Sequence, residues 1–194
     1  MSSLSQLQVD LRQMIIAIET AVSQVGMNDT NHGKRVGYIA SQIGHQLNFS
    51  DGEIQYAFEL GLLHDCGVST EQMHTNLVNH FDWNNADIHC KVGYRLLKDF
   101  EPLSKFATPI LYHHTPSLAK RNEKHVGIVH IADYITAKNI YSPIDKESGY
   151  PLDQSSLDIL SISDNDLKDI EQSLCKINTP HNEEGITLAV NDLI

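Results

Sequence analysis

The residues best suited to chemistry in this sequence are an adjacent histidine and aspartate, His64 and Asp65, at the end of an apolar run. An imidazole and a carboxylate are costly to bury unless a partner compensates for their lost hydration. Neutral imidazole nitrogen and carboxylate oxygen are together typical ligands of first-row transition metals. The pair therefore predicts a buried metal site, provided that other segments of the chain supply further ligands.

Further histidines and aspartates lie on the apolar faces of predicted helices. Apolar residues recur at helical spacing over about residues 29–47, 51–65, 85–99, 102–114 and 125–139. Polar residues on core-facing stripes are errors in a fold unless they share a purpose. The candidates on these faces are His32, His64, Asp65, His89, His113, His114 and Asp133. Their convergence would give a metal centre inside an all-α helical bundle.

Each candidate also has a purely structural interpretation. A single buried histidine such as His32 or His89 is more often a hydrogen-bonded core residue than a ligand. His113 and His114 could form a helix end with one ring in water, and Asp133 could cap a turn or pair with an arginine. The joint pattern favours a metal centre, because independent structural features would not all fall on the buried face.

The order of these residues resembles that of the HD superfamily of metal-dependent phosphohydrolases. The matching features are His32 before Arg35, the His64–Asp65 pair, His89 followed by Gly93, the His113–His114 pair, and Asp133 in Ile-Ala-Asp. The resemblance covers residues 25–140 and is greatest to the HD-GYP type, bacterial phosphodiesterases of cyclic dinucleotides. It implies an HD-domain fold.

The resemblance also implies two metal ions bridged by the carboxylate of Asp65. The ligands of one ion would be His32, His64, Asp65 and Asp133. The ligands of the other would be Asp65, His89, His113 and His114. Such histidine-rich sites favour divalent transition metals over magnesium or calcium, which prefer oxygen ligands. We expect iron or manganese, with zinc, cobalt and nickel as alternatives.

A two-metal site of this kind is suited to phosphoester hydrolysis. Metal-bound water loses a proton near neutral pH, and the ions stabilise charge on phosphate oxygens in the transition state. We expect a metal-bridging hydroxide to attack a cyclic dinucleotide or another nucleotide phosphodiester, with His64 and Asp65 as catalytic residues. Candidate contacts to substrate phosphates are Arg35, Lys91, Lys120 and Arg121. Solvated surface charge is the alternative for each of them.

The sequence departs from the HD-GYP pattern at three places. A lysine that usually contacts substrate phosphate is replaced by Val68, and Thr115 and Pro116 follow the double histidine in place of a glutamate and a Gly-Tyr-Pro loop. A glutamate that some members use for a third metal is replaced by Asn28. These differences argue against assuming cyclic di-GMP as substrate and leave the two-metal chemistry intact. A non-catalytic HDOD-like signalling or binding module and a nucleoside monophosphate phosphatase are the alternative functions.

Composition limits the other classes of function. The 194-residue chain has a formal net charge of −11 and a pI near 5.3, which argues against a nucleic-acid partner. No apolar run approaches the ~20 residues of a membrane span, and Met1–Leu7 lacks the layout of a signal peptide. Three cysteines without paired spacing predict a reducing, cytoplasmic location. We expect Cys66 and Cys90 to point away from the ligand face into the core, with a thiolate ligand as the alternative.

Two segments flank the metal-type residues. Before residue 26, apolar residues at helical spacing predict a helix that packs across the bundle or mediates a homodimer. After residue 140, a linker precedes helices near 153–161 and 164–176 and a last short one within 178–194. We therefore expect an HD-type domain at 1–140 and a linker with a C-terminal helical extension at 141–194, whose function the sequence does not indicate.

Overall fold

The protein is helical throughout the part that the computed structural model describes, which is residues 10–25, 31–68, 83–141, 151–174 and 190. Its α-helices are α1 (Leu11–Ser23), α2 (His32–Gln46), α3 (Asp51–Leu63), α5 (Trp83–Leu97), α6 (Glu101–Tyr112), α7 (Glu123–Tyr141), α8 (Gln154–Leu160) and α9 (Asp164–Leu174). A short 3-10 turn, η1 (Pro116–Leu118), precedes α7. The predicted all-α class is therefore confirmed. The last predicted helix lies almost wholly outside the described residues.

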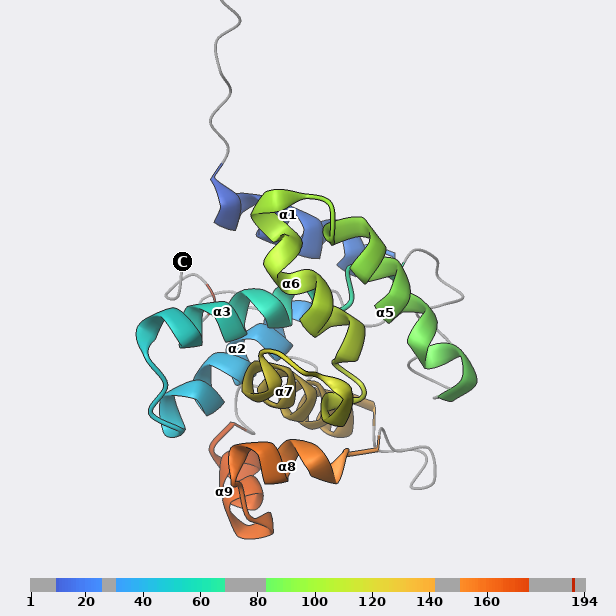
Figure 1. The fold of residues 1–194 in the computed structure, drawn as a ribbon. Helices are drawn as coiled ribbons and strands as arrows, with labels where there is room; N and C mark the ends of the chain where they lie inside the picture. Colours follow the sequence, from blue (N-terminus) through green and yellow to red (C-terminus); the bar gives the residue numbers. More distant parts are fainter. Residues whose placement is uncertain (1–9, 26–30, 69–82, 142–150, 175–189, 191–194) are drawn as a thin grey trace, which may run out of the picture.

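The bundle is built around α2, α3 and α7, which pack on one another (Figure 1). The α5–α6 pair covers one side, α1 crosses α3 and α2, and α8 lies against α7 on the side away from α6. Apolar side chains from these helices share one core, which includes Ile39, Phe58, Leu63, Phe106 and Ile131. Among the described helices, none has the length and apolar character needed to cross a membrane.

Two glycines let α2 and α3 approach each other closely. A Cβ atom on Gly61 would lie 2.6 Å from the Cα of Gly37, so the two backbones are in direct contact. Helix α3 begins with a capping box between Ser50 and Glu53 and ends at Leu63, with His64 as its C-cap. Because α2 begins at His32, the close packing brings the start of α2 beside the end of α3.

Helix α6 contains Pro109, whose nitrogen has no hydrogen to donate to the carbonyl of Lys105 four residues earlier. The hydroxyl of Tyr56 donates to this carbonyl instead, at 2.8 Å. The ring of Tyr56 also stacks on Phe106, with centroids 5.0 Å apart. Helix α3 is thereby fixed against α6, whose C-terminal end carries His113.

Candidate metal centre

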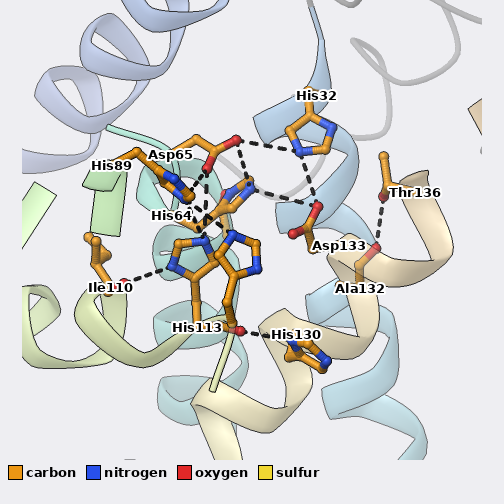
Figure 2. A network of polar contacts seen from close by, with 12 residues as sticks. His32, His64, Asp65, His89, Ile110, His113, His130, Ala132, Asp133 and Thr136 are labelled. Carbon is orange, nitrogen blue, oxygen red and sulfur yellow. Dashed lines mark hydrogen bonds and ion pairs between the residues drawn. The ribbon is translucent and has the colours of Figure 1, made fainter. Parts of the chain in front are cut away.

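The seven candidate ligands meet in the interior, although they come from five different helices or helix ends (Figure 2). His32 opens α2, His64 and Asp65 follow α3, His89 lies in α5, His113 and His114 follow α6, and Asp133 lies in α7. The side chains of His32 and Asp65 are 17% and 21% exposed, whereas the other five residues are buried. Among the seven side chains, those of His32 and Asp65 are therefore the most accessible to solvent.

The first group of donor atoms joins α2, α3 and α7. Nε2 of His32 lies 3.2 Å from Oδ1 of Asp133 and 3.7 Å from Oδ2 of Asp65. Nε2 of His64 lies 3.3 Å from the same Asp65 oxygen and 3.9 Å from the same Asp133 oxygen. Two imidazole nitrogens thus alternate with two carboxylate oxygens around a small space.

The second group of donor atoms joins α3, α5 and α6. Nε2 of His89 lies 3.2 Å from Nε2 of His113 and 3.2 Å from Nε2 of His114. Oδ1 of Asp65 lies 3.3 Å from Nε2 of His89 and 3.8 Å from Nε2 of His113. Asp65 therefore faces the first group with one carboxylate oxygen and the second group with the other.

Backbone carbonyls fix the orientation of two of the rings. Nδ1 of His64 donates to the carbonyl of Gly61 and Nδ1 of His113 donates to that of Ile110, each at 2.7 Å. A proton on Nδ1 leaves the lone pair of Nε2 directed into the cluster. This is the arrangement by which backbone groups orient metal-binding histidines.

Burial and the mutual proximity of the groups shift their protonation equilibria. Desolvation, reinforced by the neighbouring imidazoles, lowers the pKa of His113 to about 3 and moves the pKa of His114 in the same direction. Burial opposes ionisation of Asp65 and Asp133, but the surrounding histidines outweigh it and lower the pKa of both carboxyls. The pKa of His64 is raised because the two carboxylates overcome the effect of its burial. The cluster thus combines the neutral imidazoles of His113 and His114 with the ionised carboxylates of Asp65 and Asp133.

This donor set is consistent with divalent metal ions. Nε2 of His64 is buried and makes no hydrogen bond of good geometry to any described residue. Four ligands at metal–nitrogen distances of ~2.1 Å would be about 3.4 Å apart in a tetrahedral site. The shortest contacts within the two groups, 3.2–3.3 Å, are close to that spacing. Without a cation, the lone pairs of neutral imidazole nitrogens 3.2 Å apart, as in the second group, would repel one another.

The prediction for Cys90 is wrong. Its Sγ does not point away from the ligand face but lies 3.5 Å from Nε2 of His89 and 3.7 Å from Nδ1 of His113. The reason is that α6 packs against α5, so the His113 ring reaches the side of α5 next to His89. Cys66 does lie in the core, where burial raises its pKa to about 12.

His130 is a buried polar residue beside the cluster that the sequence analysis did not single out. It lies on α7, one turn before Asp133, and Nδ1 of its ring donates to the carbonyl of His113 at 2.9 Å. Its position in an apolar stretch of α7 was the one feature of the sequence that could have indicated a buried polar role. Its partners are main-chain groups, which cannot be recognised from residue types.

The residues predicted to contact substrate differ in their exposure. Arg35 is buried, whereas Lys91, Lys120 and Arg121 are exposed. Val68, at the position of the family's lysine, is buried in the turn after Asp65. Contact between the basic residues and a substrate stays a prediction.

The chain belongs to the HD domain family, whose model matches residues 30–138. This match contains all seven candidate ligands and confirms the resemblance drawn from their order. Over 134 residues the chain is 38% identical to the 3'3'-cGAMP-specific phosphodiesterase 1 of Vibrio cholerae serotype O1. The alignment covers 66% of this chain and 31% of that protein, so the chain spans about a third of the relative's length. No solved structure matches.

Proposed function

We propose that the protein is a metal-dependent phosphodiesterase that hydrolyses a cyclic dinucleotide. The observation that carries this proposal is the carboxylate of Asp65, whose two oxygens face two separate groups of imidazoles. The name of the Vibrio relative supports a 3'3'-linked cyclic dinucleotide as the substrate class.

The proposed ligands follow from the two groups. His32, His64 and Asp133 would hold one divalent ion, His89, His113 and His114 would hold the other, and Asp65 would bridge them. Iron or manganese is proposed, because histidine-rich sites with carboxylates suit such ions and the centre lacks a tetrathiolate set. Together the bound ions would polarise the phosphate and provide a water-derived nucleophile at neutral pH.

The chain's own residues prepare the site for this chemistry. The bonds from Nδ1 of His64 and His113 to backbone carbonyls hold the rings in one orientation. Burial keeps the imidazoles of His113 and His114 neutral and therefore able to bind metal without first losing a proton. The two ionised carboxylates offset only half of the four positive charges, which leaves the centre attractive to an anionic phosphodiester.

The test is metal analysis followed by a substrate panel on the same anaerobically purified protein. We expect two ions per chain, and conversion of 3'3'-cGAMP to a linear product detected by chromatography and mass spectrometry. Asp65→Asn should lose both ions and turnover while keeping its helical circular dichroism. Asp99→Asn, which changes the same functional group at an exposed position, serves as the matched control.

Three results would contradict the proposal in different ways. Metal-loaded protein that binds a cyclic dinucleotide without turnover would indicate a signalling or binding module. Turnover of nucleoside monophosphates alone would indicate a phosphatase. Full metal content in Asp65→Asn would refute the bridging role of this carboxylate.

We also propose a cytoplasmic location, based on cysteine usage, and a homodimer formed through α1. In the structure α1 packs on α3 and α2, while Gln13, Ala17 and Thr20 stay exposed on its outer face. Light scattering at micromolar concentration would give the mass of a monomer if the dimer does not form.

A further inference from the structure

His130 connects the metal centre to the C-terminal helices, because both nitrogens of its buried ring are used. Nε2 lies 2.8 Å from the backbone nitrogen of Asp153, which can only donate its hydrogen. The ring is therefore an acceptor at Nε2 and carries its proton on Nδ1, which donates to the carbonyl of His113 at 2.9 Å (Figure 2). The two bonds fix one tautomer and one orientation of the ring.

The carbonyl that accepts this bond belongs to the peptide joining His113 and His114. His113 is the C-cap of α6, where carbonyl groups have no partner within the helix. A bond from His130 satisfies this carbonyl and holds the plane of the peptide. Since the side chains on both sides of the peptide point into the second donor group, the position of His130 affects two imidazoles at once.

The other end of the connection is Asp153, which lies in the C-terminal extension. Asp153 is the N-cap of α8, and its side chain accepts a hydrogen bond from the backbone nitrogen of Ser155 at 2.9 Å. Helix α8 packs closely on α7, where a Cβ on Gly127 would lie 3.5 Å from the carbonyl oxygen of Ser156. Movement of α8 relative to α7 would therefore break the bond to His130.

We propose that His130 is a positioning residue through which docking of α8 sets the affinity of the second donor group for a divalent metal ion. This inference rests on the proposed metal centre and adds to it a role for the C-terminal extension. Partners that orient metal ligands typically contribute 10–100-fold in metal affinity. We therefore expect loss of the His130 contacts to weaken one of the two ions by about that factor.

The first experiment measures Mn²⁺ binding by the full-length protein in competition with a chromophoric chelator. In His130→Ala, one of two binding steps should weaken about 10–100-fold while the other stays within about threefold of the wild type. His130→Asn keeps a side-chain donor near the carbonyl of His113 and should recover most of the lost affinity. Thr136→Val is the control, because Thr136 is equally buried on α7 and its hydroxyl donates to the carbonyl of Ala132 within the same helix.

A second pair of variants tests transmission from α8 without altering the histidine. Asp153→Pro removes the donor N–H at a residue whose φ of −73° is compatible with proline, and Asp153→Ala removes only the side-chain cap. Lower Mn²⁺ affinity in Asp153→Pro than in Asp153→Ala is expected. Equal affinities in this pair, or unchanged affinity in a folded His130→Ala, would overturn the inference. A wild-type protein that binds no Mn²⁺, Fe²⁺ or Co²⁺ would instead refute the proposed function.

Discussion

Gly67 offers the most direct test of how the fold positions the centre. It lies in the turn after Asp65, and a Cβ atom added there would be 2.0 Å from the carbonyl oxygen of His89 and 2.5 Å from the nitrogen of Gly93. Both contacts are to backbone atoms, which cannot rotate away. Since real Cβ contacts essentially never fall below 3.0 Å, the turn at Gly67 and α5 must separate by about 1 Å in Gly67→Ala.

A displacement of this size is large for a metal site. Metal–ligand distances are reproduced to within about 0.2 Å in functional sites, so His89 could no longer bind together with His113 and His114. We expect affinity for one ion to fall at least ~10–100-fold, as when a supporting residue is lost, and turnover to fall about 100-fold. Overpacking of this kind typically costs about 1–3 kcal/mol, so we also expect the free energy of unfolding to fall by about 2 kcal/mol.

The assay compares three glycine-to-alanine variants by metal titration and thermal unfolding. Gly93→Ala meets side-chain atoms, Cγ2 of Ile110 at 2.8 Å and Sγ of Cys66 at 3.2 Å, so we expect a milder effect. Gly52→Ala has no atom within 4 Å and lies in a helix, so it should stabilise the protein by roughly 0.5–1 kcal/mol. Gly67→Ala with two ions bound at wild-type affinity would refute the reasoning.

Three further predictions concern protonation, reactivity and helix capping. Acidifying the metal-free protein from pH 7 to 5 should lower its free energy of unfolding by about 2 kcal/mol through His113 alone. The reason is that His113 has a pKa of about 3 in the folded protein, whereas in the unfolded chain it takes up a proton below pH ~6.5. Urea denaturation measures this change, and a gain in stability would mean that His64, whose pKa is raised, dominates. Cys66 and Cys90 are buried and should resist iodoacetamide at pH ~8 until the protein is denatured, as checked by peptide mass spectrometry. Ser50→Ala should cost about 1 kcal/mol through loss of the capping box and leave metal content unchanged, since Ser50 lies at the opposite end of α3 from the centre.

Much of the site could be predicted because its residues break the apolar pattern of their helices. His32, His89 and Asp133 each occupy a core-facing position, and only a shared partner explains polar groups there. The helices themselves followed from apolar periodicity, with boundaries displaced by a few residues, as for α5, which begins at Trp83. The sequence pattern of each helix was sufficient to predict these ligands, because the helix face that packs into the core also carries the metal-type side chains.

Other features depend on contacts between distant segments and could not be predicted. The direction of the Cys90 thiol is set by how α6 packs on α5, not by its place in α5. His130 acts on a carbonyl and an amide, groups that every residue carries, so no residue type marks its partners. The backbone contact of Gly67 with His89 arises only when the turn after α3 meets α5.

The centre draws its donors from stretches of chain as far apart as His32 and Asp133, and this has a consequence for the lifetime of the protein. Ions held in this way act as cross-links that close long loops and exist only in the native state. At free metal one hundredfold above the dissociation constant, a single bound ion adds about 2.7 kcal/mol to stability. Metal starvation would therefore expose the chain to proteolysis, so that its abundance in a cell would follow the supply of the metal.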